Sequence, residues 1–330
     1  MMAAPAGSQY RTTAYGGTDI TAPSLSDYQF YFGGLTFGIS TSYLVTHAQG
    51  LFGRPVRSQE ALRPNDTGAF VNPDYPGARS IVFTIVVRTT AALLQTQLDA
   101  WQAAWLATSV GEDPLVFQLP DSRRAGNSKL YRVFGRPRRI EYDTRLWRQG
   151  LTSITAEFYC ADPRIYENTL NTATISLSAS GVNGVKFNSA TNNSVTNWTG
   201  GGAGKFGVTF GSAPTTATGT ATTIGTTTAP WYAKVAGPIT TPRVTCGTGA
   251  LNFDGSLDAS QYIVIDSLNR NVWLNGDTAS SWYSHLKAGS SWWSLPASGS
   301  STVALYDDGI RTGSGSSAGV LTFQYRSAWL

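Results

Sequence analysis

The second half of this chain is a series of short runs of β-branched and aromatic residues separated by Gly, Ser, Asn and Asp. Runs of this length, bounded by turn residues at short intervals, are typical of the strands of an antiparallel sandwich. We expect strands at residues 173–177, 185–188, 205–210, 231–235, 243–246, 250–253, 262–266, 271–274, 301–306 and 320–325. The pattern predicts a β-sandwich or jelly roll, in which the Thr/Gly/Ala tract 213–229 is a surface loop.

The first half combines strand patterns with one helix pattern. Leu94, Leu98, Trp101 and Trp105 are spaced four, three and four residues apart, so they share one face of a helix near 90–108. Thr89 or Thr90 is the candidate N-cap. We expect this face to pack on a sheet, with a partner-helix surface as the alternative. Strands are expected at residues 28–39, 43–47, 81–88, 115–119, 130–134, 138–142 and 152–160, with Gly33-Gly34 as a turn or bulge.

Length and composition point to two domains. A chain of 330 residues exceeds the usual size of one domain, and its composition changes near residue 166. We therefore expect domains 1–165 and 166–330, both mainly β, the first being barrel-like or sandwich-like with one helix. Only 13% of the residues are charged, against about 25% in a typical soluble domain. A surface so poor in charge suggests extensive contact with other proteins.

A basic stretch lies between residues 123 and 148, with nine Lys or Arg and two acids. It has three interpretations: a solvated hairpin, a contact with an acidic neighbouring subunit, or a phosphate-binding stripe. For the subunit contact, we single out Arg136, Arg138 and Arg139. The formal net charge of +4 is too small to indicate nucleic-acid binding by itself. The preceding segment 49–77 is polar and rich in proline, which favours a long loop or extended arm.

Residues that could support catalysis are scarce. His47 and His285 are the only imidazoles, and neither has a Cys or carboxylate at a recognised spacing. Ser317 lies in a G-x-S-x-G match, but no His follows it and its flanks are those of a loop. Cys160 and Cys246 fall in different predicted domains, so a disulfide framework is not expected. The sequence predicts no catalytic residue, no cofactor, no metal and no membrane span.

Tryptophans are concentrated in the second half, which holds seven of the ten. Exposed Trp side chains on a sandwich can stack on sugar rings, and Trp292 and Trp293 are the candidates for such a site. Alternation along a strand places Trp273, and one of the Trp292/Trp293 pair, in the core instead. A carbohydrate-binding adhesin is therefore the alternative function.

Several segments of the second half resemble the siphovirus distal tail protein family. In that family a strand with an Asp leads through a tight turn into V-x-L-N-G, followed by a W-x-L-x-P-G segment. The corresponding residues here are Tyr262–Asp266, Asn269–Gly276 and Trp292–Pro296, with Ala297 in place of the last Gly. Phe158–Tyr166 resembles the domain junction of the family, which ends in Asp-Pro-Arg-x-Tyr. The resemblance covers the second half and the junction, and the first 150 residues only in outline.

This resemblance implies a non-enzymatic structural protein of the tail tip of a long-tailed bacteriophage. It implies that the first domain closes into a homo-oligomeric ring, commonly a hexamer, and that a galectin-like second domain projects outward. The implied partners are the tail tube protein, the tape-measure protein, the tail-tip hub and receptor-binding proteins, with DNA only passing through the ring. Assembly would take place in the host cytoplasm and the mature location would be the virion.

Overall fold

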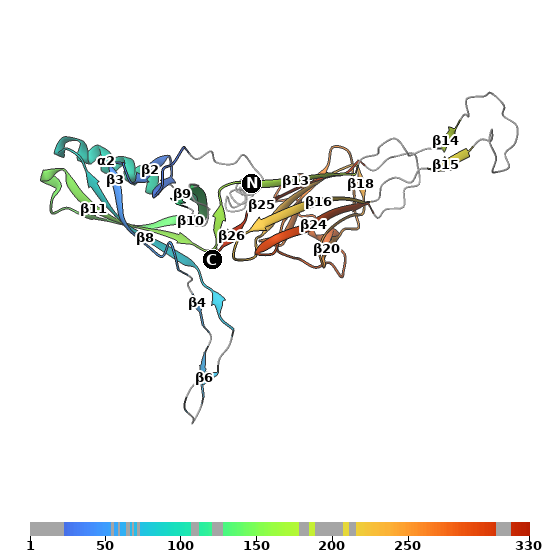
Figure 1. The fold of residues 1–330 in the computed structure, drawn as a ribbon, viewed down its shortest axis with the longest axis horizontal. Helices are drawn as coiled ribbons and strands as arrows, with labels where there is room; N and C mark the ends of the chain where they lie inside the picture. The colour runs from blue at the N-terminus through green and yellow to red at the C-terminus, as the bar shows by residue number, and fades with distance from the viewer. Residues whose placement is uncertain are drawn as a thin grey trace.

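The structure is a computed structural model of the chain. It describes residues 23–53, 73–106, 112–120, 128–177, 216–307 and 318–330, together with short pieces of 56–70 and the strand residues 185–188 and 207–210. These residues form two lobes side by side, with the helix in one lobe and a sandwich in the other (Figure 1). The protein is mainly β, as predicted, and has one α-helix among the described residues.

The first lobe is built on one antiparallel sheet, in the order β2-β1-β9-β10-β11-β8-β3. The path does not close between β2 and β3, so the described strands form an open sheet and not the barrel that was one of the two expectations. Gly33 and Gly34, both at positive φ, make the predicted turn between β1 and β2. The strands are β1 (Gln29–Phe32), β2 (Leu35–Gly38), β3 (Tyr43–Gln49), β8 (Arg79–Arg88), β9 (Asp113–Pro120), β10 (Ser128–Asp143) and β11 (Leu151–Cys160).

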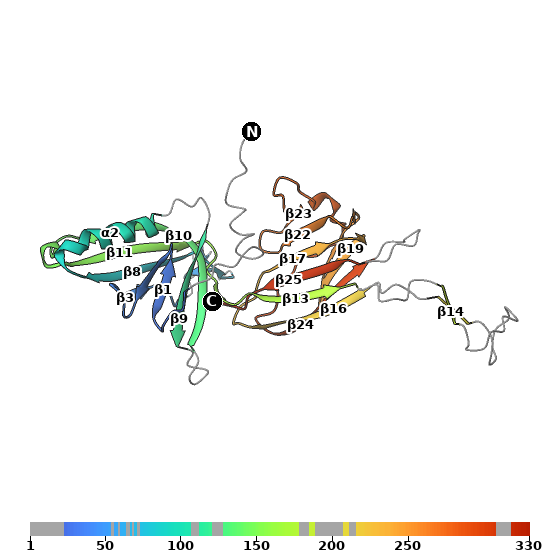
Figure 2. The ribbon, with the colours of Figure 1, turned by 90° about the horizontal axis from the view of Figure 1, so that it is seen from above.

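Helix α2 (Ala91–Trp105) covers one face of this sheet (Figure 2). Its predicted apolar face is buried, and Trp101 and Trp105 pack edge-on against Phe37 with ring centroids 5.2 and 6.2 Å apart. Aromatic pairs in this geometry add to the free energy gained by burying their surface. Thr90 is the N-cap, although its side chain accepts no capping hydrogen bond. The prediction that this face packs on the sheet is confirmed.

Strand β10 is one continuous strand that covers the two segments predicted as separate strands, 130–134 and 138–142. Its first part, up to Gly135, pairs with β9, and its second part, from Arg136, pairs with β11. A bulge between Pro137 and Arg139 lies within the part that pairs with β11. A Cβ on Gly135 would lie 2.4 Å from the carbonyl oxygen of Tyr159, so this close approach of two strands requires glycine.

The second lobe is the predicted sandwich, with its two sheets enclosing one apolar core (Figure 2). One sheet has the order β13-β25-β17-β22-β23 and the other β16-β24-β19-β20. The strands of the first are β13 (Asn171–Ser176), β17 (Trp231–Ala236), β22 (Tyr262–Asp266), β23 (Asn271–Leu274) and β25 (Val320–Tyr325). Those of the second are β16 (Thr216–Ile224), β19 (Pro242–Cys246), β20 (Gly249–Asn252) and β24 (Ser298–Asp307). Two short pairs are also present, β14 (Val185–Asn188) with β15 (Gly207–Phe210), which lies beyond the end of the sandwich in Figure 1, and β18 (Ile239–Thr240) with β21 (Ser256–Leu257).

Strand β16 contradicts the prediction of a surface loop at 213–229. Threonine alternates there with small residues, and the small side chains point inward, where Ala221 is buried and Gly219 lies against Ile175. The sequence of this strand contains few large apolar residues because the Ile175 side chain lies directly beneath it and leaves room only for small ones. The backbone amides of Thr222 and Ile224 donate to the Tyr325 and Ser327 hydroxyls, which ties this strand to the opposite sheet.

Tight turns follow β22 and β23 in the second lobe, the first of them at the position expected from the family motif. Asp266 accepts hydrogen bonds from the backbone amides of Leu268 and Asn269, at 2.9 and 3.1 Å, and so closes the turn between β22 and β23. Asn275 and Gly276 both have positive φ, of 52° and 70°. These angles are those of a primed turn, for which Asn-Gly is the favoured pair, and the Asp277 backbone amide donates to the Leu274 carbonyl across it.

The two lobes are joined by more than the chain connection. Strand β12 (Ile165–Glu167) pairs with β10 on one side and with β26 (Ala328–Trp329) on the other. The last strand of the chain therefore returns to the sheet of the first lobe. The predicted domain boundary at 165/166 falls inside β12 and stays a prediction.

Candidate interaction surfaces

The basic stretch separates into buried and exposed parts. Arg132 is buried, and its guanidinium donates to the Asn168 side-chain oxygen at 2.6 and 2.9 Å. Lys129 forms a 3.0 Å ion pair with Glu167. Both residues therefore hold the junction between the lobes together, a role that the sequence did not indicate.

The three arginines singled out from the sequence are exposed on the second part of β10. The Arg138 guanidinium lies 3.5 Å from the centroid of the Tyr159 ring, and Arg139 forms an ion pair with Glu141. These contacts hold two of the three cations against their own sheet. Their role as a subunit contact stays a prediction.

The same strand ends in an exposed ion pair. Arg145 donates to both oxygens of the Asp143 carboxylate, at 2.6 Å from Nη2 and 3.0 Å from Nε. Mainly through these side-chain hydrogen bonds, and through the Arg145 backbone amide, the pKa of Asp143 falls to about 2. The basic stretch is thus partly neutralised by its own acids.

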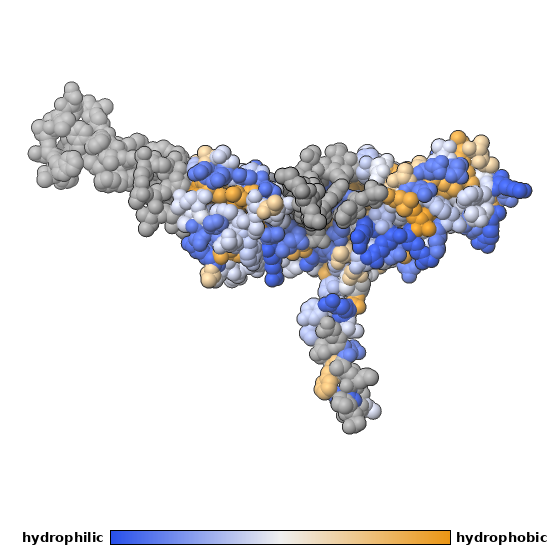
Figure 3. Space-filling view, turned by 180° about the vertical axis from the view of Figure 1, so that it is seen from behind, coloured by the Kyte–Doolittle hydropathy of each residue, from blue (hydrophilic) through white to orange (hydrophobic). Residues whose placement is uncertain are grey.

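The described pieces of segment 49–77 form a narrow two-stranded arm. Strand β4 (Val56–Arg57) pairs with β7 (Tyr75–Pro76), and β5 (Ala61–Leu62) pairs with β6 (Ala69–Phe70). Figures 1 and 3 show that these pieces stand clear of both lobes. Half or more of the Val56, Phe70 and Tyr75 side chains is exposed. An isolated two-stranded hairpin is marginally stable in water, so an arm of this kind suits contact with another protein.

Trp292 and Trp293 lie on the loop before β24 and are partly buried against the sandwich core. The Trp293 ring stacks on Trp231, with centroids 4.6 Å apart, and its backbone carbonyl accepts a hydrogen bond from the Trp231 indole. Trp293 is therefore the member of the pair that packs in the core, and Trp273 is buried as expected. Sugar stacking by Trp292 or Trp293 stays a prediction.

His285 has a partner that sequence spacing could not indicate. Its Nδ1 lies 2.9 Å from the carboxylate of Asp254, and both side chains are about half exposed. The other imidazole, His47, is exposed on β3. Cys160 and Cys246 are buried free thiols, and burial raises the pKa of Cys160 to about 12, which suppresses the nucleophilic thiolate.

The described residues contain no group of three or more His, Cys, Asp or Glu side chains that could hold a metal ion. The one described α-helix is not long and apolar enough to cross a membrane.

The Asp-Pro-Arg-x-Tyr segment folds into a compact turn at the junction. The Asp162 carboxylate accepts hydrogen bonds from the Tyr166 hydroxyl at 2.5 Å and from the Arg164 backbone amide at 3.1 Å. The buried Arg79 side chain donates to the Pro163 and Leu51 carbonyl oxygens, at 2.9 and 2.5 Å. The motif therefore has a structural role, which is to fix the direction in which the chain leaves the first sheet.

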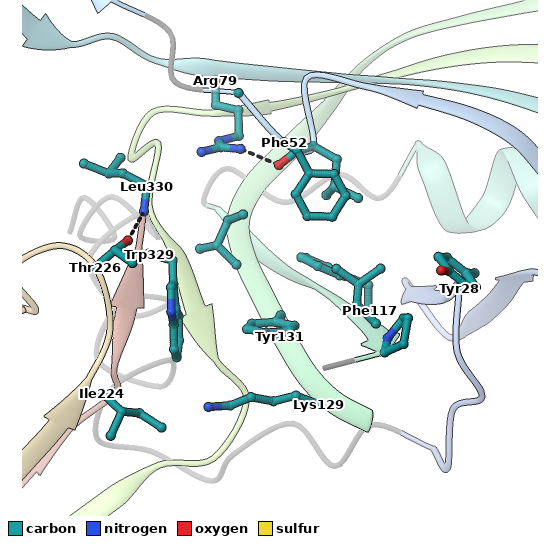
Figure 4. A pocket seen from close by; sticks show the side chains of 15 residues that line it. Tyr28, Phe52, Arg79, Phe117, Lys129, Tyr131, Ile224, Thr226, Trp329 and Leu330 are labelled. Atoms are coloured by element: carbon teal, nitrogen blue, oxygen red, sulfur yellow. Dashed lines mark hydrogen bonds between the residues drawn. The ribbon is translucent and has the colours of Figure 1, made fainter. Parts of the chain in front are cut away.

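A cavity of about 680 Å³ lies between the lobes, and we name it the junction cavity (Figure 4). Its aromatic walls include Phe117 and Tyr131 from the first lobe and Trp329 from β26. Lys129 lies beside these rings, with its Nζ 4.7 Å from the Trp329 centroid. The side chains of Phe52 and Ile224 also line it, from the base of the arm and the end of β16. This cavity was not predicted, because its residues are far apart in the sequence.

Comparison with known proteins gives similarity in structure only. No family model and no curated protein matches the sequence. The SPP1 Dit protein, described as a paradigm of the hub adsorption apparatus in phages that infect Gram-positive bacteria, superimposes with a TM-score of 0.54 and 12% identity. The match covers 92% of this chain and 99% of SPP1 Dit. A chain of the phage p2 baseplate, in its activated conformation with Ca, gives a TM-score of 0.46 at 9% identity, covering 90% of this chain and 97% of that one. The chain therefore shares its fold with SPP1 Dit across both lobes.

Proposed function

We propose that this chain is a structural protein of the tail tip of a long-tailed bacteriophage and has no enzymatic activity. The observation that carries the proposal is the similarity in fold to SPP1 Dit, which extends over nearly the full length of both chains. The family resemblance of the junction and of the second half supports the same assignment independently of the coordinates. The protein would assemble in the bacterial cytoplasm and reside in the virion.

In this proposal the first lobe closes into a ring of identical subunits, a hexamer in our expectation. Ring closure requires a heterologous interface, in which one patch meets a different patch on the next copy. The exposed part of β10 with Arg136, Arg138 and Arg139 and the arm at 49–77 are two such patches. Their charge and exposed apolar surface suit contact with a neighbouring subunit.

The second lobe would then be a galectin-like sandwich that projects from the ring. The strands of its two sheets lie within residues 171–325, and its core cluster also includes Phe134, Tyr166 and Ala328, so the sandwich would project while its base packs on the ring lobe. We expect the ring to contact the tail tube protein, the tape-measure protein and the tail-tip hub. Receptor-binding proteins would attach to the projecting lobe, and DNA would contact the ring only in passage.

The test is the shape and mass of the purified protein. Negative-stain imaging should show rings with a central hole, and native mass spectrometry should give a single multiple of the subunit mass. Replacing Arg136, Arg138 and Arg139 together with Glu should reduce the ring population at least about tenfold, because like charges then meet across the interface. A variant with the same number of reversed charges in the second lobe, at Lys234, Arg270 and Lys287, should keep its rings.

Two results would contradict this proposal. The first is a wild-type protein that stays monomeric at all concentrations and shows no rings, which would contradict ring formation. An unchanged ring mass in the Arg136, Arg138 and Arg139 variant would show that these arginines are not part of the subunit interface. It would not contradict the formation of a ring.

A carbohydrate-binding adhesin is the second candidate, because Trp292 and Trp293 remain partly exposed on the second lobe. It would be supported by binding on a glycan array that is lost when Trp292 is replaced by Ala. Trp293 is a poorer position for this test, since its ring also stacks on Trp231.

A further inference from the structure

We propose that the two lobes of this chain move as one rigid body, because an interlobe lock fixes them to each other. The lock consists of the buried side chains of Arg79, Arg132 and Arg326 and of the segment 163–168 that they bind. Relative motion is the default expectation for two domains of one chain, unless their interface is extensive. The lock lies within a single chain, so the proposal depends neither on ring formation nor on a partner.

Asn168 is bound by arginines from both lobes. Arg132, on β10 of the first lobe, donates to the Asn168 side-chain oxygen and, from Nη2 at 3.2 Å, to its backbone carbonyl. Arg326, which follows β25 of the second lobe, donates to the same carbonyl and to the Glu167 carbonyl at 3.3 Å. The Asn168 amide in turn donates to the Leu130 carbonyl at 3.0 Å. A movement of one lobe against the other would stretch these hydrogen bonds together.

Burial makes the hydrogen bonds of the lock costly to break. Arg132 is 1% exposed and Arg326 0%. A buried guanidinium that loses its acceptor is not rehydrated, so the full penalty of its desolvation remains. Hydrogen bonds donated by a charged group are also stronger than those between neutral groups. The junction should therefore resist even small displacements.

The walls of the junction cavity are fixed to the same segment. Arg79 and Lys129 line the cavity from the first lobe (Figure 4). Arg79 donates from Nε to the Pro163 carbonyl at 2.9 Å, and Lys129 is ion-paired with Glu167. The opposite wall includes Trp329, whose strand β26 pairs with β12. Closing the cavity would therefore require one wall to give up its contacts with the segment 163–168.

Each lobe also places a side chain against the core of the other. Phe134, on β10 of the first lobe, belongs to the apolar core of the second lobe, where its ring centroid lies 5.6 Å from that of Tyr166. In the opposite direction, Trp329 packs against the core of the first lobe, with its ring centroid 5.4 Å from that of Tyr131. Closely packed side chains cannot slide without losing contacts. A rotation of the lobes would disturb both cores.

The test measures the distance between the lobes by double electron–electron resonance on the full-length protein. Spin labels are attached at Thr96→Cys on α2 and Thr220→Cys on β16, both exposed positions. Cys160 and Cys246 are buried, and the protein without introduced cysteines checks that they take up no label. Labelled protein is mixed with an excess of unlabelled protein, so that distances between copies do not contribute.

A reference pair within the second lobe, Thr220→Cys with Ser284→Cys, gives the width of the distance distribution that motion of the labels alone produces. The interlobe pair should give a single distance with the same width as the reference pair. Arg326→Met and Asn168→Ala each remove hydrogen bonds of the lock. Each should broaden the interlobe distribution at least about twofold, because relative motion of the lobes is then less restrained.

Arg270→Met is the matched control, because Arg270 is an exposed arginine on the turn between β22 and β23. It should leave the interlobe width unchanged. Circular dichroism identifies the folded variants, and if one lock variant does not fold, the other and the protein with an intact lock carry the test. The proposal is overturned if the intact lock gives a broad or bimodal distribution, if a folded lock variant keeps the narrow one, or if Arg270→Met broadens it equally.

Discussion

The amino group of Lys129 lies 4.7 Å from the ring centroid of Trp329, which belongs to the last strand of the chain. The same amino group forms an ion pair with Glu167 on β12. The contact thus joins the sheet of the first lobe to the strand that leaves the second. The predictions below begin from this junction.

Replacing Trp329 with Ala should reduce the free energy of unfolding by about 2 kcal/mol, through loss of its packing on Tyr131 and of the cation–π contact with Lys129. Urea denaturation followed by circular dichroism measures the change. Tyr283→Ala, at an exposed position in the second lobe, should change stability by less than about 0.5 kcal/mol. Equal effects of the two substitutions would mean that the last strand does not stabilise the junction.

Trp105→Ala on α2 should cost about 3–5 kcal/mol, because a fully buried indole in the aromatic core is replaced by a cavity. Leu93→Ala on the opposite face of the same helix should cost less than about 0.5 kcal/mol. Both substitutions keep helix propensity high, so the difference reports burial alone. Thermal or urea unfolding of the two variants under identical conditions is the measurement.

Two glycine substitutions should differ because of what surrounds each site. Gly135→Ala should cost about 1–3 kcal/mol, since the new Cβ would meet the rigid backbone carbonyl of Tyr159. At Gly219 the nearest atoms belong to the Ile175 side chain, which can shift, and alanine also lowers the entropy of the unfolded chain. Gly219→Ala should therefore change stability by less than about 1 kcal/mol. A larger loss at Gly219 than at Gly135 would contradict this account.

The Asp143 carboxyl should titrate near pH 2 in the folded protein, and Arg145→Met should return it toward its ordinary value. Because the folded pKa lies below the unfolded one, the stabilisation from this group is present at pH values above the unfolded pKa and is lost as the pH falls toward 2. Carbon-detected NMR of the side-chain carboxyl measures both midpoints. An unchanged midpoint in the Arg145 variant would show that the ion pair does not cause the shift.

Local patterns in the sequence were enough to predict the helix and most strands. The helix follows from four apolar residues at helical spacing, and the turn between β22 and β23 follows from Asp266, whose carboxylate bonds the next backbone amides. Each of these signals acts within a few residues. They depend little on the rest of the fold, which is why they could be read from the chain alone.

The features that the sequence did not reveal depend on contacts between distant segments. Strand β16 was missed because Gly219 and Ala221 are small, and their inward direction is evident only once Ile175 lies beneath them. The change of neighbour along β10, from β9 up to Gly135 to β11 from Arg136, depends on where those distant strands lie. The Asp254–His285 pair and the junction cavity likewise bring together residues far apart along the chain.

The pairing of β12 with β26 also determines the order in which the protein can reach its final form. Residues 328 and 329 are translated after the whole of the sandwich, so β12 has no partner on that side until synthesis has passed them. The first lobe therefore emerges from the ribosome with one sheet position unfilled. Only chains that have been translated through Trp329 can form the complete junction.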